Sequence, residues 1–286
     1  MGDIKNIGQF ALSWKSIEEL KTPLYILTAL VALMYVVQIV NLGILSFILL
    51  LAVFIALIVA VWKYSVNEVL VKALSLKGYT TRTIGFLNYI AYYIVILIAT
   101  LIPWFGGNYL WFQIGMFLLG IIGVILLFVA KSYLIGTLLA VIGFGIYFLA
   151  LIYTSIRISF GLPAYISSVG GITDAILRSW NITSNNVIES TLIRLGNWIY
   201  GMKAVLLFFA LGAVLMVMAI VIMTQDPLRI LSSTPNPAVT ILQLLSEIVF
   251  AYVSIFLNFT SFFGDSAVLA MLEGKNGNSK NVKKTA

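Results

Sequence analysis

Ionisable side chains inside apolar stretches are the first candidates for chemistry in this sequence. Glu247 lies near the start of an apolar block with Gln243 one turn before it, and Lys131 stands between two apolar blocks. An ionisable group in hydrocarbon is costly and is a functional hypothesis by default. Two structural alternatives stay open: Glu247 can be solvated near the interface or pair with Arg229, and Lys131 can extend its ammonium to the head groups.

The absence of cysteine and histidine limits the reactions that this chain can catalyse. It removes thiolate nucleophiles, imidazole and thiolate metal ligands, and the Ser-His-Asp triad. The sequence also contains no phosphate-binding Gly-Lys loop and no paired carboxylates. We therefore expect a non-enzymatic protein with no catalytic residues, no cofactor and no bound metal.

Composition indicates a membrane protein. Of the 286 residues, 62% are hydrophobic and 9% are charged, whereas soluble domains have roughly 45–50% and about 25%. Several apolar blocks approach or exceed the roughly 17–25 residues that span a bilayer. They are Leu24–Val40, Leu42–Trp62, Ile84–Ile102, Trp111–Ala130, Leu134–Ile156, Ala204–Met223 and Thr240–Phe263. The sequence therefore predicts an all-α polytopic transmembrane helical bundle of six or seven spans in the cell membrane.

Basic residues predict which segments face the cytoplasm. The N-terminus, residues 63–83, residues 157–203 and the C-terminal tail are rich in Lys and Arg, which favours the cytoplasmic side. Three apolar blocks separate residues 63–83 from residues 157–203, and three crossings cannot return the chain to the same side. We expect Trp111–Ile156 to contain a re-entrant, broken or strongly tilted element near Lys131. This gives six spans, with both ends of the chain in the cytoplasm. The alternative is seven spans, with the C-terminus outside.

Aromatic residues in the uncharged link Pro103–Tyr109 are typical of an outer-face interfacial belt. Glycines are frequent in the blocks that follow this link, and we expect them to let helices approach closely. Glycine-interrupted blocks also occur at transporter binding sites, which is the alternative. These glycines are Gly115, Gly120, Gly123, Gly136, Gly143 and Gly145.

The chain is predicted to form one transmembrane domain over residues 1–264 and a polar, basic tail over residues 265–286. Amphipathic helices at about 5–20, 64–80 and 172–200 are expected to lie along the membrane surface. A packed core helix is the alternative for 64–80, disfavoured because no other soluble segment is evident to cover it. The candidate contacts to head groups or to an anionic partner are Lys63, Lys72, Lys77, Arg82, Arg157, Arg178 and Arg194.

A run of residues in the centre of the chain resembles a known membrane family. The run Arg157-Ile158-Ser159-Phe160-Gly161-Leu162-Pro163-Ala164 is followed by Gly171, Asp174-Ala175, Arg178-Ser179-Trp180 and Thr183. Residues 157–186 thereby resemble the membrane domain associated with some glycerophosphodiester phosphodiesterases and its stand-alone relatives in bacteria and archaea. Ser167 or Ser168 stands where that family has an acidic residue. The resemblance implies a helical membrane scaffold and no phosphodiesterase activity, because that activity belongs to a separate soluble barrel domain.

Two functions stay open at this point. In size and format the chain is similar to the polytopic membrane component of archaeal DNA-import systems, which implies small membrane partners, an ATPase and a nucleic-acid substrate guided by clustered Lys and Arg. This likeness predicts a membrane subunit of a transport or translocation complex. The alternative is a lipid-interacting scaffold or assembly protein whose basic segments bind anionic head groups.

Overall fold

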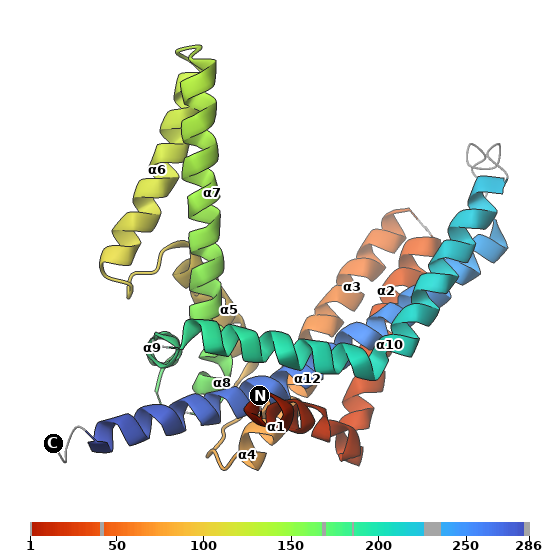
Figure 1. The fold of residues 1–286 in the computed structure, drawn as a ribbon. Helices are drawn as coiled ribbons and strands as arrows, with labels where there is room; N and C mark the ends of the chain where they lie inside the picture. Colours follow the sequence, from red (N-terminus) through yellow and green to blue (C-terminus); the bar gives the residue numbers. More distant parts are fainter. Residues whose placement is uncertain (1, 41–42, 168–169, 185, 226–235, 283–286) are drawn as a thin grey trace. The chain divides into compact units, whose positions relative to one another are not determined.

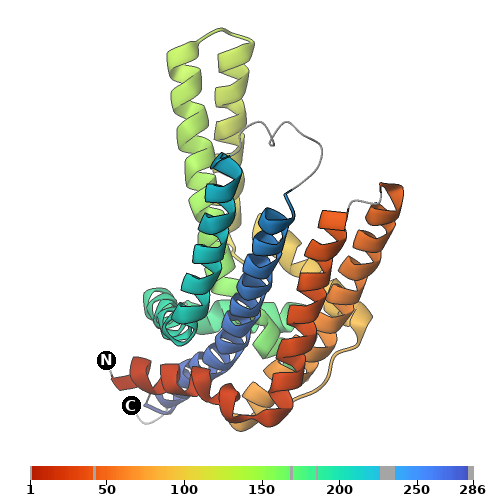
Figure 2. The ribbon, with the colours of Figure 1, turned by 90° about the vertical axis from the view of Figure 1, so that its right-hand side faces the viewer.

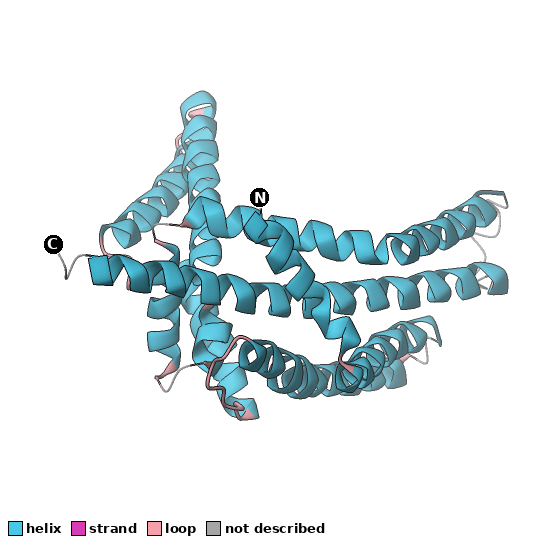
Figure 3. Cartoon of the chain, turned by 60° about the horizontal axis from the view of Figure 1, so that its bottom comes forward, coloured by secondary structure: helices cyan, strands magenta, loops and turns pink. Residues whose placement is uncertain are grey.

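The computed structural model describes residues 2–40, 43–167, 170–184, 186–225 and 236–282. These ranges are helical and contain no strand, which confirms the all-α prediction (Figure 3). Six of the described helices are long and apolar enough to cross a membrane, as the six-span prediction requires. The chain divides into two compact units, where the sequence analysis expected one domain: unit 1 contains residues 1–86 and 192–271, and unit 2 contains residues 87–191 and 272–286.

Unit 1 contains four of the candidate spans. Its helical elements are α1 (Gly2–Leu12), the 3₁₀ turns η1 (Ser13–Ser16) and η2 (Glu18–Leu20), α2 (Lys21–Val40), α3 (Ile44–Ala60), the π-helix η3 (Val61–Leu70), α4 (Val71–Leu76), and most of α10 (Val187–Gln225) and α12 (Pro237–Val282). α2 and α3 form an antiparallel hairpin (Figure 2). Gly43 begins α3 with a φ of 63°, a backbone conformation that glycine adopts without a Cβ clash.

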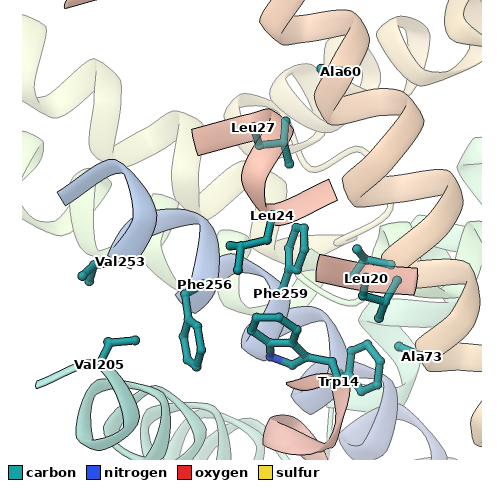
Figure 4. Close-up of a cluster of buried hydrophobic side chains, with 12 residues drawn as sticks. Trp14, Leu20, Leu24, Leu27, Ala60, Ala73, Val205, Val253, Phe256 and Phe259 are labelled. Carbon is teal, nitrogen blue, oxygen red and sulfur yellow. The ribbon is translucent and has the colours of Figure 1, made fainter. Parts of the chain in front are cut away.

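A buried cluster around Trp14, here called the Trp14 core, is the centre of unit 1 (Figure 4). The Trp14 indole N–H donates to Thr260 Oγ1 at 3.1 Å, and its ring meets those of Phe256 and Phe259 edge-on. The buried members are Trp14, Leu20, Leu24, Leu27, Ala60, Val69, Ala73, Val205, Val253, Phe256, Phe259 and Phe263. The N-terminal turns, the extension of α3 and the middle of α12 therefore pack on one another.

Residues 64–80, predicted to form a separate helix on the membrane surface, continue the helix of α3 as far as Leu76. η3 and α4 continue directly from α3, and Val66, Val69, Leu70 and Leu74 are fully buried. Asn67 fixes the returning chain by exchanging two hydrogen bonds with the Ile84 backbone. This burial favours the packed core helix, because the N-terminal segment and α12 contribute side chains to the same buried cluster as Val69 and Ala73.

Two other predicted boundaries also change. The segment 172–200 is two helices, since α9 (Ile172–Thr183) ends before α10, and α10 then runs on into a span. α9 starts where Asp174 accepts the Gly171 N–H at 2.9 Å. The predicted tail at 265–286 is helical to Val282, and its side chains at Val268, Leu269 and Leu272 are fully buried. α12 is thus 46 residues long, about 69 Å against about 30 Å of hydrocarbon.

Unit 2 is built around the hairpin of α6 (Asn108–Phe128) and α7 (Tyr133–Ile158), with α5 (Phe86–Leu101), α8 (Gly161–Ile166) and α9 near its lower end (Figure 1). Glycines allow close approach along the hairpin. A Cβ on Gly123 would overlap the backbone of Ala140, and one on Gly143 would overlap the backbone of Gly120. Gly136 is equally close to Leu127, whereas Gly115 and Gly145 face open space. The helix-approach prediction is confirmed for the four inward glycines.

The irregular block lies elsewhere than predicted. α6 and α7 are unbroken, and Lys131 is an exposed turn residue with a φ of 51° between them. The short helix is α5, with 16 residues, or about 24 Å, less than the hydrocarbon thickness of about 30 Å. The prediction of a broken element within Trp111–Ile156 is therefore wrong, because the chain reverses at Lys131 between two full-length helices.

The aromatic link also lies at an unexpected end of unit 2. Phe105 and Tyr109 contact the Trp180 ring of α9 at centroid distances of 5.0 and 5.9 Å. The link is thus at the same end of the α6–α7 hairpin as α9, which contains Arg178. Because basic residues favour the cytoplasmic side, this position argues against the predicted outer face. The α6–α7 hairpin leaves from this link and returns to Arg157, since the Tyr109 hydroxyl donates to the Ala150 carbonyl at 2.7 Å, so α6 and α7 count as two crossings in the charge rule.

Candidate functional site

Three exposed lysines surround the Trp14 core in unit 1, and we call them the interfacial lysines. Each lies over an aromatic ring: Lys15 with Phe256 at 5.3 Å, Lys63 with Tyr64 at 5.0 Å and Lys203 with Tyr200 at 5.7 Å, from Nζ to the ring centroid. Core residues Ala60 and Val205 are their near neighbours in sequence. The apolar parts of α3 and α10 therefore meet the core at the level of these ammonium groups.

Other predicted cations of unit 1 already have partners. Lys72 Nζ is 3.3 Å from the exposed carboxylate of Glu19. Lys77 Nζ lies 3.7 Å from the Phe10 ring centroid, and burial lowers the pKa of Lys77. Arg82 is half-buried and also interacts with another group of the protein. Of the four cations predicted in 63–83, Lys63 is the one that the described structure presents as exposed.

Arg194 points into unit 1, so the structure does not place it as a head-group contact. Its Nε and Nη2 each donate to the Asp265 carboxylate at 2.7 Å, which is bidentate geometry. The Asp265 side chain is 9% exposed. The pair joins α10 to α12, and its burial makes the loss of either partner costly.

In unit 2, Arg157 joins α7 to α9. Its guanidinium donates to Thr183 Oγ1, to the Tyr153 hydroxyl and to the Trp180 carbonyl at 2.7–3.1 Å, and it stacks 3.9 Å from the Trp180 ring centroid. Arg157 is 6% exposed. Ser179 continues this connection, since its hydroxyl donates to the Arg157 carbonyl and accepts the Phe160 N–H.

Arg178 also points toward protein. It donates to Glu273 Oε1 at 2.7 Å and to the Ala164 carbonyl at 3.5 Å. Gly161, in the same region, leaves room for the Tyr92 hydroxyl, which a Cβ there would meet at 2.7 Å. The residues that carry the family resemblance therefore hold α7, α8 and α9 together.

The intramembrane candidates of unit 1 gather around Glu247. Glu247 on α12 lies near the Tyr35 hydroxyl on α2. Gln243 Nε2 is 3.8 Å from Met223 Sδ on α10. Arg229, the alternative partner of Glu247, lies outside the described residues. Lys131, in the exposed turn of unit 2, belongs to no such group, and its position fits the head-group alternative.

Three residues of the polar interior were missed in the sequence analysis. Asp265 and Glu273 were assigned to a solvated tail, although they pair with Arg194 and Arg178, and Asn197 was not singled out. The helical spacing of Ala267, Val268 and further apolar residues after Gly264 was the available signal, because it shows that α12 continues.

Comparisons with protein families, with curated proteins and with solved structures return no match. In the part of the chain that the structure describes, no group of three or more Asp, Glu, His or Cys side chains is placed to hold a metal ion. Function is therefore inferred from the geometry of the two units.

Proposed function

We propose that this integral membrane protein is a non-enzymatic scaffold subunit that binds anionic lipid head groups and carries other components of a membrane complex. The observation that supports this proposal most strongly is that the arginines and the lysines have different surroundings. Arg157, Arg178 and Arg194 are engaged inside their units, whereas the interfacial lysines are exposed around the Trp14 core.

The interfacial lysines have the features of head-group contacts. A lysine stem covers apolar surface while its ammonium reaches water, and an aromatic ring beneath it adds a cation–π attraction. Basic residues near an anionic membrane contribute about 1 kcal/mol each. Lys15, Lys63 and Lys203 occur where apolar helices meet the Trp14 core, which fits the plane of the head groups.

The Trp14 core favours a partner-carrying role. A span needs about 20 residues, but the apolar helices Ile44–Leu76 and Pro237–Gly274 have 33 and 38 residues. We assign their extra length, together with α1, to a packed layer around the Trp14 core. We place the binding of soluble partners, such as an ATPase, on this layer, and of small membrane subunits on the lipid-facing helices. The cell membrane is the proposed location.

Removing the interfacial lysines is expected to remove the effect of anionic lipid. In nanodiscs, the unmodified protein should melt at a higher temperature with phosphatidylglycerol than with phosphatidylcholine. K15Q/K63Q/K203Q should lose most of that temperature difference, because it lacks three lysines that contribute about 1 kcal/mol each to the attraction. The control K5Q/K21Q/K72Q removes the same charge from other positions, two of which are paired with Glu18 and Glu19, and should retain the difference. Equal losses in both variants would refute specific head-group contacts.

Transport is the second candidate function. The position of Glu247 within an apolar candidate span favours it. An ionisable side chain beside Tyr35 among apolar spans is typical of an ion or proton pathway. If the chain is the membrane subunit of a transport complex for DNA or another polyanion, the interfacial lysines would attract the polyanion.

The Glu247 hypothesis predicts a loss of transport without a loss of fold. E247Q and Y35F should each reduce uptake at least about tenfold in the native host while membrane insertion is unchanged, because each removes one member of the polar contact. E19Q, which changes an exposed carboxylate, is the control. Normal uptake of labelled DNA and of protons by E247Q would exclude this role.

A further inference from the structure

Asn197 is a buried amide without a protein partner. It lies on α10 in unit 1, is 3% exposed, and both its Oδ1 and its Nδ2 are buried without a hydrogen bond. An amide side chain has two N–H donors and an acceptor oxygen. Because buried polar groups are almost always satisfied, the structure requires a partner that the chain itself does not supply.

The cavity beside Asn197 has room for that partner. Its volume is about 30 Å³, and its polar lining comes from Arg194, Asn197, Trp198, Thr260, Ser261 and Asp265. A water molecule needs at least about 10–15 Å³ by the same measure and two to four polar partners. Thr260 Oγ1 already accepts from Trp14 and donates to the Phe256 carbonyl, but it retains a lone pair.

The charges around the cavity select a neutral occupant. Arg194 and Asp265 are joined by two hydrogen bonds and cancel each other. A cation would be repelled by the guanidinium, and an anion by the carboxylate. The volume is too small for an organic solute. We infer that this cavity is a binding site for one ordered water molecule that links Asn197 to the Arg194–Asp265 pair.

This water site connects α10 to α12. A Cβ on Gly264 of α12 would overlap Asn197 Nδ2, so Gly264 leaves the space that the Asn197 side chain occupies. Sliding one helix along the other by a turn would separate Asn197, Arg194 and Asp265 from their partners and leave them buried and unsatisfied. The water and the ion pair therefore set the register of the two long helices of unit 1.

A high-resolution density map of the full chain in nanodiscs tests this inference directly. A water peak between Asn197 and the Arg194–Asp265 pair is the expected result. In N197L the peak should disappear and the melting temperature should fall by roughly 2–4 °C, because the remaining cavity groups lose their bridge. N88L makes the same change at an exposed asparagine, and it should neither remove the water peak nor lower the melting temperature.

Two results would overturn the water site. One is an empty cavity in a map of the unmodified protein that resolves other buried waters. The other is a higher melting temperature for N197L, since an apolar side chain of similar shape stabilises a site that is dry. If N197L does not fold, the map of the unmodified protein alone decides.

Discussion

Replacing Gly123 by leucine is expected to prevent the α6–α7 hairpin from forming. A Cβ at this position would overlap the backbone of Ala140, so no side-chain rearrangement can make room, and the helices must separate. Overpacking against flexible side chains costs about 1–3 kcal/mol, and a backbone clash costs more. We expect G123L to yield little folded protein in size-exclusion chromatography and to lower the melting temperature of what remains.

Glycines on the outer faces of the same helices provide the control. A Cβ on Gly115 or Gly145 would meet nothing within 4 Å. Alanine favours a helix over glycine by about 1 kcal/mol, so G115A and G145A should be neutral or slightly stabilising. If these variants were as damaging as G123L, close helix approach would not be the role of Gly123.

Changing Asp265 to asparagine is expected to destabilise unit 1 by about 3–5 kcal/mol, because the Arg194 guanidinium is left in the interior without its carboxylate. Chemical denaturation in detergent micelles would measure this loss. The double variant R194M/D265L should recover most of the stability, since it removes both charges together and replaces them with apolar groups.

Glu18 supplies the matched control for Asp265. It pairs with Lys21 across one helical turn, but its side chain is 81% exposed, and exposed pairs contribute about 0–1 kcal/mol. E18Q should therefore change stability little. If D265N were as mild as E18Q, the pair would be solvated, and the α10–α12 connection would not depend on it.

The membrane-spanning helices could be predicted from sequence because the bilayer is the same solvent for every apolar block. The amphipathic segments could not be placed, since their partners are remote: the Trp14 indole bonds to a residue 246 positions away. Hydrophobic spacing in 64–80 shows that one face is covered, but it does not distinguish lipid from α12. The same limit made α5 resemble a span, because the block 84–102 is apolar although its helix has 16 residues.

The candidate site was partly predictable for a related reason. Positive charge identified Lys63 and the arginines as important, but charge alone does not show whether a side chain points to lipid or to protein. Arg157, Arg178 and Arg194 all point inward, where a planar guanidinium with several donors satisfies carbonyls, hydroxyls and carboxylates that a lysine cannot match. Asp265 and Glu273 became visible only once α12 was seen to continue through the predicted tail.

The side of the membrane on which Trp104 lies tests the six-span account most directly. The natural chain has no cysteine, so single-cysteine variants can be labelled with a membrane-impermeant maleimide on intact cells. The account predicts that Y133C, at the start of α7 beside the turn of the α6–α7 hairpin, reacts from outside, whereas W104C and K63C react only after the membrane is permeabilised. Labelling of W104C from outside would contradict it, because α5 would then be a full span.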